Sequence, residues 1–216
     1  MIPARAERAS VSALHPDWRR SWGSSITDAE LRGAMEANPR LQRRITEAIG
    51  GAHGIAISNA PRLEGVAAGA AKAIATDRVG FTRLCGLAQI GRRLAMATNP
   101  DDYGALAKAF GGEALAAAVR IATKLPEGDD SHGYDSEQLV PAVDRLGTAV
   151  LREWIETLPR TPQGWLTMML PRARGDDVSS IGTQRSIAIV EAALDVWPLS
   201  TAERPGEMRR LARRAA

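Results

Sequence analysis

Large side chains are scarce in this sequence, and their scarcity limits the folds that it can adopt. Only 4% of its 216 residues are aromatic, and more than half of these few are Trp, whereas 38 residues are Ala. Alanine has the highest helix propensity, and the β-branched and aromatic residues that favour strands are few. The composition therefore argues strongly against an all-β fold and favours a helical one.

Cysteine and long apolar runs are also nearly absent. The single cysteine, Cys85, excludes an internal disulfide framework and fits a reducing compartment. No stretch approaches the ~20 apolar residues that span a bilayer, and the first ten residues lack the apolar core of a secretory signal. These features predict a soluble cytoplasmic protein.

Lysine is rare as well, since 25 of the 28 basic residues are Arg and the net charge is only +3. A protein that binds nucleic acid is expected to carry a larger and more clustered basic excess. The charge balance therefore does not favour nucleic acid as the partner.

Proline, asparagine and glycine divide the chain into helical segments. Asn38-Pro39 is a helix-start signal, and further helices are expected from Asp77 to about Ala97, over about 100–110 and over about 113–124. The clearest amphipathic pattern has apolar residues at three-to-four spacing, at Leu139, Val143, Leu146, Val150 and Trp154. The patterns predict an all-α fold, an irregular bundle of about eight to ten helices.

A single helical domain over residues 1–216 is expected, with a flexible, exposed acidic loop at 126–136. A basic helix over 201–216 is expected to form the tail. The acidic loop resembles a calcium-binding loop only loosely, because its glycine falls at the fifth position and Val140 takes the place of the final glutamate. The tail carries two arginine pairs, which are either solvated or contact an acidic partner or an anionic membrane surface.

Motifs for enzyme chemistry are not found, so no catalytic, metal-binding or cofactor-binding residue is predicted. The histidines His15, His53 and His132 are isolated from one another, whereas metal sites need several converging ligands. Gly86 and Gly91 have the spacing of a phosphate-binding loop, but Arg92-Arg93 follows them in place of Lys-Ser/Thr. These glycines are better interpreted as sites of close helix packing, and Cys85 as a small apolar core residue.

Two segments are candidates for recognition. The helices over about 100–110 and 113–124 resemble a helix-turn-helix, although the second begins with Glu113 and is rich in alanine, which cannot read base edges. The other candidate is the basic-aromatic segment Trp18, Arg19, Arg20 and Trp22, a composition common in binding hot spots. The alternative is that both tryptophans fix the N-terminal segment onto the core.

The segment from Leu84 to Lys124, LCGLAQIGRRLAMATNPDDYGALAKAFGGEALAAAVRIATK, resembles the central region of the SctK/YscK/PscK family of type III secretion proteins. The family pattern has leucine, cysteine and glycine, then a long helix with an arginine pair, here Arg92-Arg93, and then two short alternating helices. The resemblance extends to LHPDW at residues 14–18, and to Gln163-Gly-Trp165 and Leu170-Pro171 after a long amphipathic helix.

The resemblance implies a non-enzymatic adaptor at the cytoplasmic face of the inner membrane. Members of the family bridge the cytoplasmic domain of the inner-membrane ring protein to the pod protein of the sorting platform. The implied partners are therefore these two proteins, with no small-molecule substrate and with membrane contact only through the ring protein. Helix-turn-helix DNA binding is the alternative function.

Overall fold

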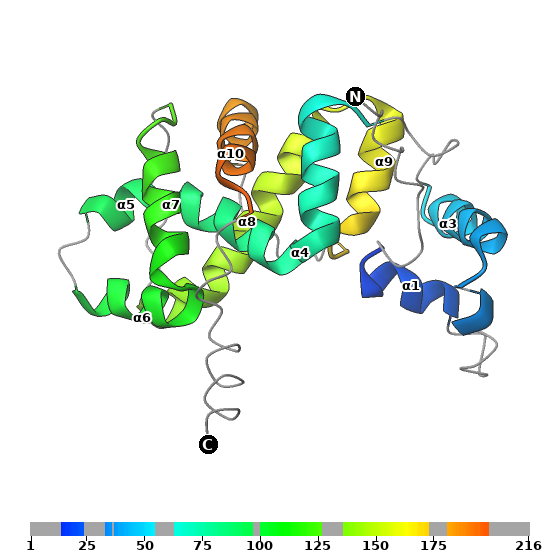
Figure 1. Cartoon of the computed structure of the whole chain (residues 1–216), viewed down its shortest axis with the longest axis horizontal. Coiled ribbons are helices and arrows are strands. Elements are labelled where there is room, and N and C mark those ends of the chain that lie inside the picture. The colour runs from blue at the N-terminus through cyan, green and yellow to red at the C-terminus, as the bar shows by residue number, and fades with distance from the viewer. Residues whose placement is uncertain are drawn as a thin grey trace, which may run out of the picture. The chain divides into compact units, whose positions relative to one another are not determined.

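The computed structural model describes residues 14–23, 33–35, 37–54, 63–96, 100–126, 136–172 and 181–198. Helices joined by turns make up these ranges, with no strand among them (Figure 1). The prediction of an all-α bundle of about eight to ten helices is therefore confirmed. The predicted acidic loop, apart from its first and last residues, and the predicted tail helix lie outside the described residues.

The described helices occur in this order along the chain: α1 (Pro16–Gly23), α3 (Pro39–Ala52), α4 (Gly65–Gln89), α5 (Gly91–Met96), α6 (Pro100–Phe110), α7 (Gly112–Ala122), α8 (Ser136–Glu156), α9 (Arg160–Met169) and α10 (Thr183–Val196). The two short helices expected over about 100–110 and 113–124 correspond to α6 and α7. The predicted amphipathic helix corresponds to α8.

The helices group into two compact units. Unit 1 comprises Met1–Ala75 and Ile155–Asp177, and unit 2 comprises Thr76–Trp154 and Val178–Ala216. Two of the three unit boundaries fall inside α4 and α8, the two longest described helices, and the third lies between Asp177 and Val178. The single domain expected over residues 1–216 stays a prediction.

Helix α4 is kinked at Asp77, whose backbone leaves the helical region (φ −151°, ψ 84°). The Asp77 side chain accepts a hydrogen bond from the backbone amide of Gly80 at 2.9 Å, as a helix N-cap does. A helical segment therefore begins at Asp77 as predicted. The expectation that it continues to about residue 97 is wrong, since the chain turns at Ile90 and α5 begins at Gly91, a residue of low helix propensity.

Unit 1 brings the residues before α1 against the end of α9. The backbone amide of His15 donates a hydrogen bond to the carbonyl oxygen of Met168 at 2.9 Å, and the neighbouring Leu14 is completely buried. Helix α3 begins where the sequence predicts, because the Asn38 side chain accepts a hydrogen bond from the Arg40 amide at 2.9 Å. The bond of His15 joins the residues before α1 to α9, and α1 and α3 also contact each other.

Unit 2 is built around a close approach of α4 and α8. A methyl group on Gly86 would overlap the carbonyl oxygen of Val143, and one on Gly147 would overlap that of Thr82. Neither glycine has a positive φ, so it is the lack of a side chain, and not conformational freedom, that these positions require. Glycine at both positions therefore allows the two backbones to touch.

Helices α5, α6 and α7 pack onto α4 and α8 through one apolar cluster. The cluster takes residues from all five helices and includes Leu87, Leu94, Leu106, Leu115, Ala118, Leu139, Val143 and Leu146. Helix α7 contacts α5, α6 and α10, and so it lies at the centre of this part of unit 2. Each leucine buried here stabilises the fold by about 1.5–3 kcal/mol relative to an exposed one.

Helix α10 is joined to the rest of unit 2 by buried polar contacts. The guanidinium of Arg185, only 4% exposed, donates to the side-chain and backbone oxygens of Gln89 at 2.8 and 3.2 Å, and to the carbonyl oxygen of Pro126 at 2.9 Å. The Glu153 carboxylate accepts hydrogen bonds from the Ser186 hydroxyl at 3.0 Å and the Ile181 amide at 2.6 Å. These bonds fix α10 and the end of α7 against α4 and α8.

Candidate interaction surfaces

Trp18 of α1 is a packing residue of unit 1. Its side chain is 6% exposed, and its indole Nε1 donates a hydrogen bond to the carbonyl oxygen of Leu170 at 2.8 Å. The His53 ring meets it edge to face at 4.9 Å between centroids, and the Arg172 guanidinium lies 5.8 Å from its ring centroid. The second interpretation of the segment, in which its tryptophans fix it to the core, therefore describes Trp18.

The three other candidate residues of this segment differ in what the structure shows. The Arg20 side chain is 77% exposed and forms an ion pair with Asp17 at 2.8 Å on the same helix. Arg19 is half-buried, and its Nε has no hydrogen-bond partner among the described residues. Trp22 belongs to α1, but its side chain lies outside the described part of the chain. Arg20 is thus the candidate residue that the structure places at the surface.

The glycine pair that resembles a phosphate-binding loop serves helix packing, as the sequence predicts. Gly86 lies against α8, and a Cβ on Gly91 would come within 2.6 Å of the Ala122 Cβ and 2.7 Å of the Ala118 carbonyl oxygen. Arg92 is also used in packing, because its guanidinium donates to the carbonyl oxygen of Leu125 at 2.8 Å, just after α7. A cationic side chain at the C-terminal end of a helix satisfies free carbonyl groups and complements the helix dipole.

Cys85 is completely buried in α4. Burial raises the pKa of its thiol far above its ordinary value, because the surroundings disfavour the thiolate. The thiol is therefore neutral, and the interpretation of Cys85 as a core residue is confirmed.

The histidines do not gather at one place. His15 precedes α1, with its Nδ1 3.4 Å from the Asp17 carboxylate, and His53 packs on Trp18. His132 lies outside the described residues. In the ranges that the structure describes, no three His, Cys, Asp or Glu side chains are placed so that they could hold a metal ion.

The α6–α7 pair, which resembles a helix-turn-helix in sequence, is firmly packed in unit 2. Gly111 joins the two helices with a φ of 88°, which glycine adopts readily. Early positions of α7 that would have to meet base edges are instead turned into the core, at Leu115, Ala117 and Ala118. The exposed face of α7 carries Ala116, followed by Arg120. This distribution gives α7 little with which to read DNA sequence.

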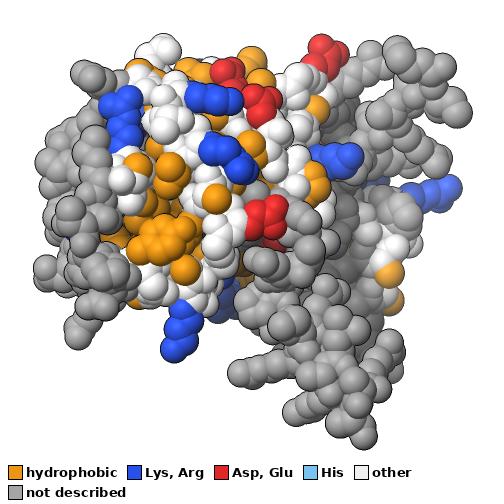
Figure 2. All heavy atoms as spheres, turned by 60° about the vertical axis from the view of Figure 1, so that its left-hand side comes forward, with side chains coloured by type: hydrophobic (Ala, Val, Ile, Leu, Met, Phe, Trp, Pro, Cys, Tyr) orange, Lys and Arg blue, Asp and Glu red, His pale blue; other side chains and the backbone are white. Residues whose placement is uncertain are grey.

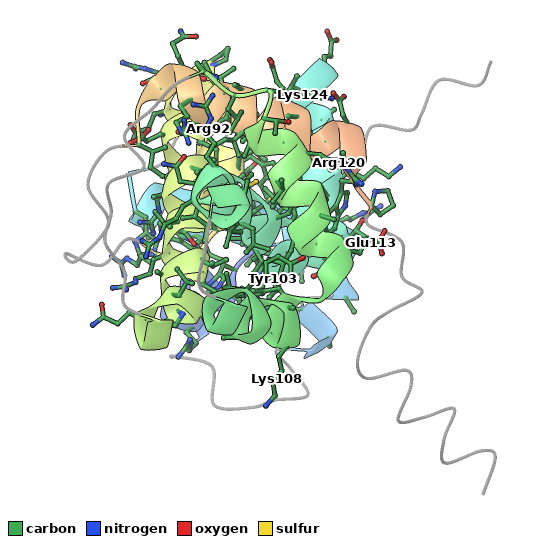
Figure 3. The ribbon with its side chains drawn as sticks, turned by 90° about the vertical axis from the view of Figure 1, so that its left-hand side faces the viewer. Arg92, Tyr103, Lys108, Glu113, Arg120 and Lys124 are labelled. Carbon is green, nitrogen blue, oxygen red and sulfur yellow. The ribbon has the colours of Figure 1, made fainter. Side chains whose placement is uncertain are left out.

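Helices α6 and α7 carry charges of both signs. Over α5, α6, α7 and the turn after α7 the sequence has five cations, Arg92, Arg93, Lys108, Arg120 and Lys124, and three acids, Asp101, Asp102 and Glu113; the side chains of Asp101 and Asp102 lie outside the described part of the chain. In Figure 3, Arg120 and Lys124 lie along α7, Lys108 points away from α6, and Tyr103 lies between Arg120 and Lys108. The sequence does not indicate the exposure of Tyr103, because its spacing of three residues from Leu106, which is buried, would predict that both lie on one helix face.

No known protein family, no curated protein and no solved structure matches this chain. Among the described helices, none combines the length and the apolar character needed to cross a bilayer.

Replacing Trp18 separates the packing role of the segment from its exposed charge. Trp18→Phe keeps an aromatic ring but leaves the Leu170 carbonyl oxygen without its donor, so the free energy of unfolding should fall by about 1–3 kcal/mol. Arg20→Ala removes an exposed ion pair and should change it by less than about 0.5 kcal/mol. Guanidinium denaturation measures both, and equal losses would contradict the assignment of Trp18 to packing.

The buried thiol predicts a pH dependence of stability. The unfolded thiol ionises near pH ~8.5, whereas burial raises the pKa of Cys85 in the fold, so its stabilising contribution is complete below that pH and is lost as pH rises. From about pH 7.5 to about pH 10, the unfolding free energy of the unchanged chain should therefore fall more steeply than that of Cys85→Ala. The extra slope approaches about 1.4 kcal/mol per pH unit above the unfolded pKa. Denaturation curves at several pH values measure it, and parallel pH profiles would count against it.

Proposed function

We propose that the chain is a non-enzymatic adaptor of a type III secretion system, which bridges the inner-membrane ring protein to the pod protein of the sorting platform. It would act in the cytoplasm, at the cytoplasmic face of the inner membrane, and it would contact the membrane only through the ring protein. The proposal rests on the resemblance of residues 14–197 to the SctK/YscK/PscK family.

One contact of unit 1 supports it most directly. Two parts of the resemblance that are far apart in sequence, LHPDW at residues 14–18 and Leu170-Pro171, pack on each other in the fold. The indole of Trp18 bonds the carbonyl oxygen of Leu170 across 152 positions of sequence. Residues that depend on each other for packing are expected to recur together in one fold family, whatever the surface residues do.

Residues of the central resemblance are likewise used for packing. Gly86 lets α8 pack closely on α4, and Gly91 lets α7 pack closely on α5. Cys85 is buried, and the Arg92 side chain donates a hydrogen bond to a carbonyl oxygen after α7. Each of these residue types can take part in catalysis or phosphate binding elsewhere, but here each one serves to build a helical scaffold. A scaffold that displays surfaces suits an adaptor.

A bridging assay tests the proposal. The cytoplasmic domain of the ring protein from the same secretion system is immobilised, and the pod protein is added with and without the chain. We expect the pod protein to be retained only when the chain is present, since an adaptor needs both surfaces at once. Retention that does not depend on the chain, or none in its presence, would contradict the proposal.

The same assay tests the N-terminal basic segment. If Arg19 and Arg20 contribute to a partner contact, Arg19→Ala/Arg20→Ala should weaken retention of one partner while the melting temperature is unchanged. A hot-spot residue typically contributes ~2 kcal/mol or more to binding. Normal retention by this double variant would make the segment structural.

A further inference from the structure

On the face of the molecule drawn in Figure 2, charges of both signs are mixed, so this face favours no partner of one charge. Lys and Arg side chains lie there as well as Asp and Glu side chains, with hydrophobic side chains among them. A histidine at the end of a helix is a sharper feature, because protonation near neutral pH changes which hydrogen bonds its ring can form. His15 stands in such a position, directly before α1.

His15 caps α1 with both its backbone and its ring. Its carbonyl oxygen accepts hydrogen bonds from the amides of Trp18 and Arg19, at 3.0 and 3.4 Å. Its ring Nδ1 accepts another, from the amide of Asp17, at 3.2 Å. Asp17 is the second residue of the helix, and a side chain that accepts from this position acts as an N-cap. The imidazole therefore takes the place of the side-chain oxygen that Asn38 supplies at the start of α3.

The capped end of α1 is also where this helix meets the end of α9 and the residues that follow it. The amide of His15 donates to the carbonyl oxygen of Met168 at 2.9 Å, and the Asp17 carboxylate accepts from the backbone amide of Arg172 at 3.3 Å. The side chains of His15 and Asp17 are 19% and 17% exposed, so these bonds are partly shielded from water while the ring stays accessible to protons. The cap therefore contributes both to the first turn of α1 and to its contact with the chain around α9.

The charges near the ring act on it in opposite directions. The charged and titratable side chains that the structure places at this end of α1 are Asp17 and Arg20 on the helix, Arg172 after α9 and His53 after α3. The Asp17 carboxylate lies 3.4 Å from Nδ1 and favours a protonated ring, but it is shared with the Arg20 guanidinium at 2.8 Å. The positive end of α1 and the bond from the Asp17 amide favour the neutral ring. Protonation therefore exchanges one partner of Nδ1 for another.

We propose that His15 is a proton-sensitive cap of α1, which fixes the first turn of the helix when its ring is neutral and leaves that turn uncapped when its ring is protonated. An imidazolium ring has two N–H donors and no acceptor, so it cannot accept from the Asp17 amide. Its Nδ1–H instead donates to the Asp17 carboxylate, which must then serve the ring as well as the Arg172 amide. Histidine ordinarily titrates near pH ~6.5, so a small change of pH is enough for this exchange.

The exchange affects the basic-aromatic segment of α1. Trp18, Arg19, Arg20 and Trp22 all belong to this helix, so an uncapped first turn changes how firmly the segment is held. The inference rests on the contacts of unit 1 and not on the adaptor role.

The tautomer of His15 in the full-length chain tests the proposal first. Nitrogen NMR spectra of the ring distinguish a nitrogen that carries a proton from one that does not. At about pH 8 we expect the proton on Nε2 and none on Nδ1, since Nδ1 must accept from the Asp17 amide. A ring that carries its proton on Nδ1 at this pH would overturn the proposal without any substitution.

Hydrogen exchange of the Trp18 and Arg19 amides then measures the cap itself. After correction for the intrinsic exchange rate, their protection should fall at least about threefold from about pH 8 to about pH 5.5, the size expected when a helix loses its N-cap. The fall should follow the titration of the His15 ring in the same sample. In His15→Asn the side-chain oxygen accepts throughout this range, so protection should stay high and constant.

The matched control is His53→Phe, which keeps an aromatic ring against Trp18 but removes the second titratable ring. This variant should keep the pH-dependent loss of protection. A loss that persists in His15→Asn, that disappears in His53→Phe, or that is absent from the unchanged chain while His15 titrates would contradict the proposed cap. Because these measurements use no secretion component, their failure leaves the bridging assay unaffected, and failure of that assay leaves the result on His15 standing.

Discussion

The close approach of α4 and α8 is the contact on which unit 2 depends. At Gly86 and Gly147 the two helices meet through their backbones, and any side chain larger than hydrogen would overlap a carbonyl oxygen of the other helix. Close packing of this kind gains dispersion energy over many atom pairs while using no large side chains. It suits a chain in which 38 residues are alanine and 4% are aromatic.

The exposed surface follows from this buried contact. With α4 and α8 held together, Leu87 and Leu146 belong to the apolar cluster against which α5, α6 and α7 pack. Gly91 allows a second close helix contact, because its lack of a side chain lets α5 approach α7 at Ala118 and Ala122. The positions of the outer faces of α6 and α7, which include the exposed Tyr103, therefore depend on the glycines beneath them.

Much of the local structure could be predicted from the sequence, because caps and periodicity act over a few residues. Asn38 and Asp77 cap helices where expected, and the apolar spacing of α8 was correct. Long-range contacts could not be predicted, since no local pattern records that Trp18 bonds Leu170 or that Gly147 meets Thr82. Tyr103 was missed because exposure depends on which face of α6 the core selects.

The candidate site was predicted only in part for the same reason. Two tryptophans that flank a pair of arginines have the composition of a binding site whether their rings lie inward or outward, and the structure turns Trp18 inward against α9 and the residues that follow it. Arg92-Arg93 was noticed as a pair, but its use could be assigned only once Arg92 was seen to bond Leu125. The sequence shows which residues are charged, but it does not show which groups each charged side chain bonds in the fold.

The most direct measurement compares alanine at two helical glycines by chemical denaturation. Gly147→Ala places a methyl group on the Thr82 carbonyl oxygen, so the free energy of unfolding should fall by about 1–3 kcal/mol or more. Gly104→Ala lies in an exposed helix with open space around it and should raise that free energy by about 0.5–1 kcal/mol. Opposite signs are the predicted result, and a Gly147→Ala protein as stable as Gly104→Ala would contradict the account.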